Sequence, residues 1–226
     1  MGAIYWQLND CWPVISWASI DYYGRWKALH YSAKRFFAPL LLSACEEGTA
    51  VSLHVTNDTL HAFNGKMEWK LRTNATDVLA EGAKAVEVAA LSSAEVEHLD
   101  FAEYLKTTEA MRSTYLEYRL LSAEGAVISS GTVLFVKPKQ FEFANPEIKL
   151  EVAEQADRFI ITLTSSAFAK NVELDLTDSD CVFSDNNFDL SAGVPVKVEA
   201  LKADMSKLLS LVQLKESITV RSMYDI

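Results

Sequence analysis

The strongest constraint on the fold is the period of two that the chain adopts after Pro39. Hydrophobic and polar residues alternate there in short runs, as they do in β-strands that bury one face. The runs are Val51–Val55, Lys66–Arg72, Thr114–Leu120, Thr132–Val136, Ile148–Val152, Phe159–Leu163, Val172–Leu176, Val194–Val198 and Ile218–Val220. Many short strands over two lengths of roughly 100 residues predict two antiparallel immunoglobulin-like β-sandwiches, over residues 38–138 and 139–226. Residues 94–111 fit a helix and a strand equally well.

Residues 1–37 have a different composition. They contain ten of the 24 aromatic residues, including four of the five Trp, and they carry four Lys and Arg against two Asp. Ala3–Leu8 predicts a short buried strand that leads into a loop. Helical spacing then relates Trp26, Leu29, Ala33 and Phe36, and Pro39 ends the predicted helix. One strand, one loop and one helix form a single βα unit, which cannot close a core by itself.

Charge and composition exclude several classes of function. The chain has 21 Lys and Arg against 31 Asp and Glu, a net charge of −10, without a basic stripe, so we expect no nucleic-acid partner. No apolar run reaches the ~18 residues of a membrane span, and the first residues lack the charged region of a signal peptide. We therefore expect a soluble protein without a membrane partner. Two segments, Asn57-Asp58-Thr59 and Asn74-Ala75-Thr76, match the glycosylation sequon at a frequency close to chance.

Metal and nucleophilic chemistry is not indicated either. The three Cys are far apart, which suits neither a disulfide framework nor a metal site. None of the four His has a second His at ligand spacing. We expect no metal and no organic cofactor.

The segment Asn9-Asp10-Cys11-Trp12-Pro13 is the best candidate for chemistry. Proteins bind sugars by stacking Trp rings on apolar C–H faces while Asp and Asn side chains bind the hydroxyls. The residues that supply both functions are Trp6, Asn9, Asp10, Trp12 and Trp17. The alternative is that Trp6 and Trp17 belong to the core and that Asp10 forms a turn. Composition alone favours neither interpretation.

Two longer motifs carry a resemblance to a known family. Tyr5–Pro13 (YWQLNDCWP) and Ser16–Tyr31 (SWASIDYYGRWKALHY) closely resemble the β-mannosidases of glycoside hydrolase family 2. In that family this run forms the last strand and last helix of the catalytic (β/α)8 barrel. Phe183–Leu190 is similar to the SDNxFDL signature of the family's C-terminal immunoglobulin-like domain. The resemblance spans the whole chain, although residues 38–138 match by pattern only.

The resemblance implies a mainly β fold, with two tandem immunoglobulin-like sandwiches preceded by a strand-loop-helix remnant of the barrel in residues 1–37. Members of the family are retaining glycosidases that use two Glu residues as acid/base and nucleophile. The resemblance places both Glu upstream of Tyr5, and this chain has neither an Asn-Glu dipeptide nor seven preceding βα units. We therefore expect a C-terminal portion of such an enzyme that contains no catalytic residue and is inactive alone.

The parent enzyme would remove terminal β-linked mannose from the non-reducing ends of manno-oligosaccharides or N-glycan cores. By resemblance, Trp6, Asn9, Asp10 and Trp12 would form the edge of its sugar pocket, since barrel enzymes place their sites after the strand ends. The sandwiches would serve as scaffold. The compartment depends on the source: periplasmic or extracellular in a bacterium, lysosomal in an animal.

Other classes of function stay open. The sandwiches could form an accessory carbohydrate-binding module, or a module for domain packing or dimerisation. Related β-galactosidases and β-glucuronidases share the fold. Residues 1–37, with one bare strand edge, are expected either to fold back on the first sandwich or to pair with a second copy in a homodimer.

Overall fold

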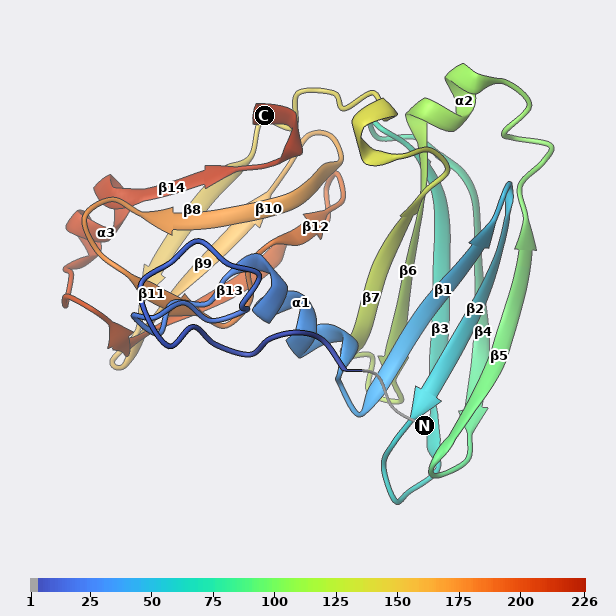
Figure 1. Cartoon of the computed structure of the whole chain (residues 1–226). Coiled ribbons are helices and arrows are strands. Elements are labelled where there is room, and N and C mark those ends of the chain that lie inside the picture. Colours follow the sequence, from blue (N-terminus) through green and yellow to red (C-terminus); the bar gives the residue numbers. More distant parts are fainter. Residues whose placement is uncertain (1–3) are drawn as a thin grey trace. The chain divides into compact units, whose positions relative to one another are not determined.

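The structure is a computed structural model that describes residues 4–226, and most of its regular structure is β-strand (Figure 1). The chain divides into two units. One unit is Arg35–Asn145, and the other joins the described part of Met1–Lys34 to Pro146–Ile226. The mainly β fold class with two sandwiches is confirmed. Among residues 4–226, no helix is long and apolar enough to cross a membrane.

The unit Arg35–Asn145 is a sandwich of two antiparallel sheets. The first sheet has the order β1-β2-β5, formed by β1 (Leu40–Glu47), β2 (Ala50–Asn57) and β5 (Ser92–Asp100). The second has the order β4-β3-β6-β7, formed by β3 (Phe63–Thr73), β4 (Val78–Val88), β6 (Thr114–Ser122) and β7 (Val127–Leu134). Val51, Leu53 and Val55 of β2 are fully buried because alternate residues of a strand face the same side. The unit also contains the short helix α2 (Thr108–Ser113) and a 3₁₀ turn, η1 (Pro138–Gln140).

The C-terminal unit contains the second sandwich. One sheet has the order β11-β13-β9-β8, formed by β8 (Lys149–Glu154), β9 (Arg158–Thr164), β11 (Cys181–Phe183) and β13 (Val196–Met205). The other has the order β12-β10-β14, formed by β10 (Ala169–Leu176), β12 (Phe188–Leu190) and β14 (Ile218–Arg221). The core includes Phe159, Ile161 and Leu163 of β9, all fully buried. Helix α3 (Leu211–Ser217) and the turn η2 (Met223–Asp225) follow β13 and β14.

The alternating runs predict the strands well. Each of the nine predicted runs overlaps one observed strand. The ambiguous residues 94–111 are divided, because β5 continues to Asp100 and α2 begins at Thr108. The predicted helix is also confirmed, as α1 (Ala28–Phe36).

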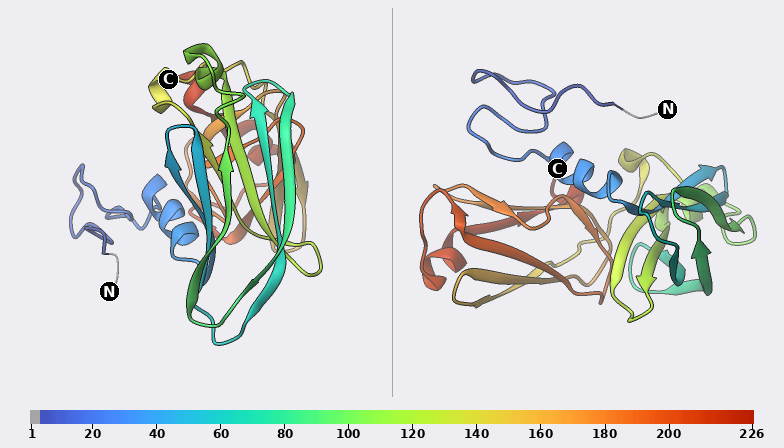
Figure 2. Two further views of the ribbon diagram at one scale, coloured as in Figure 1. Left: turned by 90° about the vertical axis from the view of Figure 1, so that its right-hand side faces the viewer. Right: turned by 90° about the horizontal axis from the view of Figure 1, so that it is seen from below.

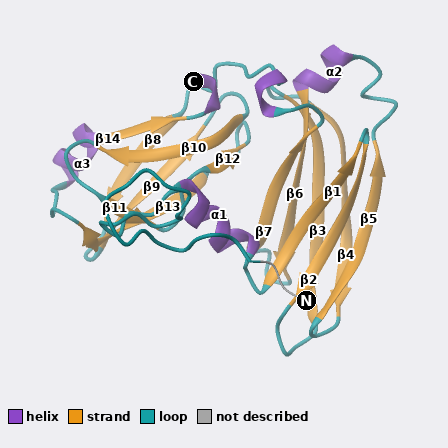
Figure 3. Ribbon diagram, viewed as in Figure 1, coloured by secondary structure: helices purple, strands orange, loops and turns teal. Residues whose placement is uncertain are grey.

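The predicted strand Ala3–Leu8 is wrong for the residues that the structure describes, and Ala3 lies outside them. Residues 4–8 form no strand, and Figure 3 shows loop up to α1. Among residues 4–226, the backbone hydrogen bonds to this segment come from Ser19 N, to Gln7 O and Leu8 O, and from Ile20 N, to Leu8 O. A parallel strand needs a ladder of partners along its edges. Residues 4–226 contain no such ladder for this segment, so it stays irregular.

The described part of residues 1–34 groups with the C-terminal sandwich and not with the first one. In both views of Figure 2 much of the irregular segment before α1 stands off the C-terminal sandwich, but its end reaches the sandwich, where Arg25 Nη1 lies 3.7 Å from Asp180 Oδ1. The expected fold-back on the first sandwich is therefore wrong. The physical reason is the seat of Tyr31, which is 2% exposed and hydrogen-bonded to the edge of the C-terminal sandwich.

Candidate functional site

Asp10 is the centre of the candidate sugar-binding loop. The residue is only 6% exposed, and its side chain only 2%. Ser16 Oγ donates to its Oδ1 at 2.5 Å, and Lys27 Nζ lies 3.1 Å from its Oδ2. The hydroxyl of Ser16, and to a smaller extent the ammonium of Lys27, hold the pKa of Asp10 below its usual value. The carboxylate is therefore ionised at neutral pH, and Ser16 and Lys27 each bind one of its two oxygens.

Backbone hydrogen bonds close the loop around Asp10. Asp10 N donates to Ile20 O at 3.0 Å, and Ile20 N donates to Leu8 O at 2.8 Å. Lys27 also binds the loop. Its backbone N donates to Ser19 O at 2.9 Å, and its Nζ lies 3.3 Å from Ser16 O. Residues 8–20 thus form a compact loop that is held by the residue just before α1.

The other predicted site residues lie at the surface of this loop. Asn9 is exposed, and its Nδ2 donates to Asp10 O at 3.2 Å. The side chains of Trp6 and Trp12 are 72% and 66% exposed. Residues 6–12 therefore present two indole rings and an amide to solvent, while the ionised carboxylate of Asp10 in the same segment is buried. These are the two kinds of group that sugars need: flat apolar faces and hydrogen-bonding partners.

Sequence analysis missed Ser16 and Lys27 as members of this site. Their signal is a physical requirement and not a motif: a carboxylate that is buried in a loop needs donors for its oxygens. Both residues lie inside the Ser16–Tyr31 motif, but nothing in their spacing shows that they converge on Asp10.

A second turn joins the loop to α1. Asp21 Oδ1 accepts hydrogen bonds from the backbone N of Tyr23 and of Arg25, both at 2.9 Å. Its Oδ2 lies 2.6 Å from Arg25 Nε. Gly24 has a φ of +83°, a conformation that glycine adopts without steric cost. Asp21–Arg25 thus forms a turn in which the carboxylate of Asp21 binds the backbone and the guanidinium of Arg25.

Helix α1 is seated on strand β11 of the C-terminal sandwich. The Tyr31 hydroxyl accepts a hydrogen bond from Phe183 N at 3.2 Å. Burial raises the pKa of Tyr31 to about 12, so the hydroxyl stays neutral. The Trp26 ring packs on the rings of His30 and Tyr31, at centroid distances of 4.2 and 5.2 Å. These contacts fix the residues that precede and begin the helix.

The Phe183–Leu190 motif is built into the framework of the sandwich. Asn186 is buried; its Oδ1 accepts from Leu174 N, and its Nδ2 donates to Leu174 O, both at 2.8 Å. Asp189 binds Lys170 Nζ at 2.9 Å and Asn171 N at 3.0 Å. The motif therefore connects β10 with β11 and β12, and its polar residues serve structure.

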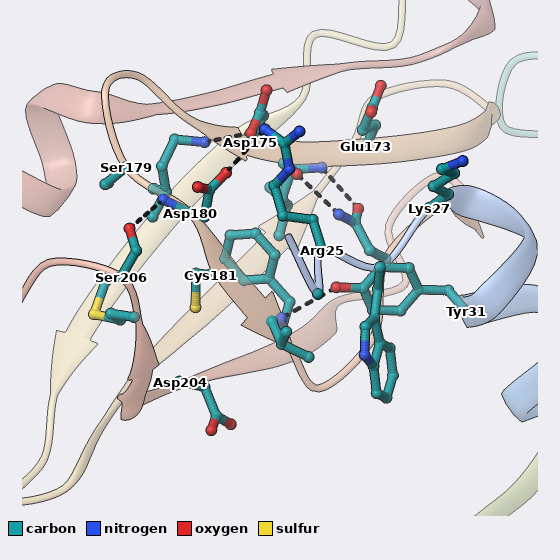
Figure 4. Close-up of a pocket in the computed structure, with 18 of the residues that line it drawn as sticks. Arg25, Lys27, Tyr31, Glu173, Asp175, Ser179, Asp180, Cys181, Asp204 and Ser206 are labelled. Carbon is teal, nitrogen blue, oxygen red and sulfur yellow. Dashed lines mark hydrogen bonds and ion pairs between the residues drawn. The ribbon is translucent and has the colours of Figure 1, made fainter. Parts of the chain in front are cut away.

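A cavity of about 710 Å³ lies between residues 23–31 and the edge of the C-terminal sandwich (Figure 4). Its charged lining includes Arg25, Glu173, Asp175, Asp180 and Asp204. Within residues 4–226, no group of three or more His, Cys, Asp or Glu side chains is arranged to hold a metal ion. The Cys181 thiol also lines the cavity, and burial raises its pKa to about 12, which suppresses thiolate chemistry.

The role of Ser16 can be tested by titration. In Ser16→Ala the pKa of Asp10 should rise toward its ordinary value, because the strongest donor to the carboxylate is lost. A carboxyl with a lowered pKa adds stability above its unfolded-state pKa, and that stability disappears as the pH falls through the folded-state value. The variant should therefore lose stability at neutral pH and resemble the unchanged protein at low pH. NMR of the Asp10 carboxyl carbon measures the pKa, with Asp21 as the internal control. An unchanged Asp10 pKa would show that Lys27 alone sets it.

Comparisons with known proteins cover both sandwiches and the loop. Residues 49–140 match a family described as "Mannosidase Ig/CBM-like domain", and residues 143–226 match an "Ig-fold domain". The chain is 32% identical over 195 residues to beta-mannosidase of Capra hircus, which covers 83% of this chain and 22% of that protein. It is 26% identical over 239 residues to beta-mannosidase A of Aspergillus fumigatus, covering 100% of this chain and 25% of that protein.

The fold is shared with a solved structure. The beta-D-mannosidase from Dictyoglomus thermophilum matches with a TM-score of 0.82 at 21% sequence identity, over 96% of this chain and 26% of that one. The chain thus spans about a quarter of the length of the proteins that it matches.

Proposed function

Because the chain belongs to the β-mannosidases of glycoside hydrolase family 2, as a C-terminal part of such an enzyme, we propose that it supplies the edge of the sugar pocket in a retaining β-mannosidase. That enzyme hydrolyses terminal, non-reducing β-D-mannose residues. The catalytic Glu pair comes from the remaining length of the enzyme. Residues 1–37 are the end of its barrel, and the two sandwiches are scaffold.

The observation that carries the proposal is the loop around Asp10. Its ionised carboxylate is held in place by Ser16 and Lys27, while Asn9 and Trp12 stand exposed beside it in the sequence. A fixed acceptor and an exposed indole suit the hydroxyls and the C–H face of a pyranose. Trp6 adds a second exposed ring.

The exposed apolar side chains of the segment support a covering partner. Ile4 is 98% exposed, and Ile15 and Trp17 are also exposed. A segment that exposes several large apolar side chains at once is a candidate for an interaction site. In the enzyme the other βα units of the barrel cover it. In a preparation of the 226-residue chain alone, a second copy covers it, giving a homodimer through residues 1–37.

A chimera tests the proposal. In it, this chain replaces the matching 22% of the Capra hircus protein. The chimera should hydrolyse p-nitrophenyl β-mannoside, whereas the chain alone should show no turnover, because both steps of the displacement need the two carboxyl groups. Light scattering should find the isolated chain as a dimer. Turnover by the pure isolated chain would contradict the proposal, and so would a folded chimera without activity.

A further inference from the structure

Helix α1 connects the Asp10 loop to the C-terminal sandwich. On the sandwich side, Tyr31 accepts its hydrogen bond from Phe183 N, and Lys34 Nζ donates to Ser184 O at 2.7 Å. Ser184 is itself fixed to β13, since its N donates to Glu199 O and its Oγ accepts from Glu199 N, both at 2.8 Å. The helix therefore rests on backbone groups that belong to the framework of the sandwich.

On the loop side, α1 and the residue before it hold two buried polar groups. Lys27 Nζ binds the Asp10 carboxylate at 3.1 Å. His30 Nδ1 lies 3.1 Å from Ser19 Oγ, which donates to Leu8 O at 2.9 Å. Ser19 is completely buried. Ser19 thus joins the loop end near Leu8 to the helix, and Lys27 joins Asp10 to the residue that precedes the helix.

We infer that the C-terminal sandwich positions the Asp10 loop through helix α1, with Tyr31 and Lys34 as positioning residues. The consequence of this coupling for sugar binding rests on the proposed function. The coupling between the sandwich and the loop does not. The Phe183–Leu190 motif then has a task beyond its own sandwich: it provides the seat for the helix that carries the pocket edge.

The short helix and the irregular loop explain why this seat is needed. An isolated helix of nine residues is unstable in water, since helices shorter than ~12–15 residues are marginal. The loop has no strand ladder among the described residues, so Lys27 and His30 add to the few backbone and Ser16 hydrogen bonds that order it. Sites that bind ligands need their groups fixed to within about 0.5 Å. Loosening α1 therefore releases Asp10 without removing any contact to sugar.

Hydrogen exchange in the 226-residue chain tests this directly. Tyr31→Phe removes only the hydroxyl that accepts from Phe183 N. The amides of Asp10 and Ile20 should then exchange ~5–10-fold faster, as expected for one lost buried hydrogen bond. In the double variant Tyr31→Phe, Lys34→Met the acceleration should exceed tenfold. In the double variant Tyr31→Phe, Lys34→Arg, the side chain at position 34 keeps a donor. Its exchange rates should therefore return close to those of Tyr31→Phe alone.

Matched controls separate this effect from general destabilisation. Tyr104→Phe and Lys207→Met change exposed residues outside this seat and should leave the Asp10 and Ile20 amides unaffected. The Ile161 amide in the buried strand β9 reports global unfolding and should keep its rate in every variant. Faster exchange at Phe183 with unchanged rates at Asp10 and Ile20 would overturn the inference. An increase shared equally by Ile161 would overturn it too.

The chimera links the result to activity. There the Tyr31→Phe variant should raise KM for p-nitrophenyl β-mannoside more than it lowers kcat, because binding geometry is loosened while the catalytic carboxyl groups are untouched. If exchange accelerates and kinetics do not change, the loop is positioned as inferred but does not line the sugar pocket. That outcome rejects the proposed function and retains the coupling. Unchanged exchange rejects the coupling and leaves the proposed function to its own test.

Discussion

Replacing Asn57 should unfold the first sandwich unit more readily than any change at its surface. Asn57 is 0% exposed. Its Nδ2 has two N–H groups and lies within hydrogen-bond distance of three carbonyl oxygens, those of His61, Val88 and Ala89, at 2.9, 3.3 and 3.1 Å, so one N–H is shared. Its Oδ1 accepts from the N and the Oγ1 of Thr59, at 3.0 and 2.7 Å. One side chain thus joins the end of β2 to the end of β4.

The expected loss follows from the groups left without partners. Each buried polar group that loses its hydrogen bond costs about 1–3 kcal/mol, so Asn57→Ala should lower the free energy of unfolding by about 3 kcal/mol. Asn57→Asp keeps the shape but turns a carboxylate toward three carbonyl oxygens, and at neutral pH it should cost at least as much. Hydrogen exchange of the Leu71 amide in β3, or urea unfolding, measures the loss for this unit.

Asn64→Asp is the matched control, because Asn64 lies exposed on the neighbouring strand β3. It should change the free energy of unfolding by less than ~0.5 kcal/mol. Equal effects at positions 57 and 64 would contradict the account of Asn57. Asn57-Asp58-Thr59 matches the glycosylation sequon. In the folded unit, however, the side-chain amide of Asn57 is buried and hydrogen-bonded. The Thr of the sequon serves as a local hydrogen-bond partner.

The strands that sequence predicts best are those with one buried face. Val51, Leu53 and Val55 alternate with polar residues because the sheet that contains them has a core side and a solvent side. The edge strand β4 escapes prediction, since most of its residues are exposed and several are Ala. Strands β11 and β12 have three residues each, too few for a period to appear.

Long-range partners account for the remaining errors. Ala3–Leu8 has a strand-like composition, but a strand exists only where other strands pair with it, and composition carries no information on that pairing. The same holds for the candidate site. The motif identifies Asn9, Asp10 and Trp12, but the convergence of Ser16 and Lys27 on Asp10 comes from the turn at Asp21–Arg25 and the seat of α1. Neither can be read from residue spacing.

Trp12 is the residue on which the proposed sugar contact depends most. Its side chain is 66% exposed, so Trp12→Ala removes little that supports the fold. If the indole covers one face of a mannose ring, its loss costs about 1.5–3 kcal/mol of binding, which corresponds to ~10–160-fold in kcat/KM. Asp10→Ala should also lower activity, but it leaves Lys27 without its buried partner and therefore disturbs the loop as well.

A control in the same chimera distinguishes sugar contact from general surface effects. Trp17→Ala removes an indole with 68% exposure from the same segment. Composition makes Trp17 a sugar-binding candidate, but it is not among the four pocket-edge residues that the family resemblance implies. We expect its kcat/KM to stay within about twofold of the unchanged chimera. A similar loss at both positions would indicate that the segment needs its aromatic residues for covering the barrel and not for binding sugar.

The most direct test of the account is therefore kcat/KM for p-nitrophenyl β-mannoside in the Trp12→Ala chimera, measured together with its melting temperature. We expect a loss of at least tenfold in kcat/KM with a melting temperature within about 1 °C of the unchanged chimera, because an exposed side chain contributes little to stability. An unchanged kcat/KM would contradict the claim that this chain forms the edge of a mannoside pocket.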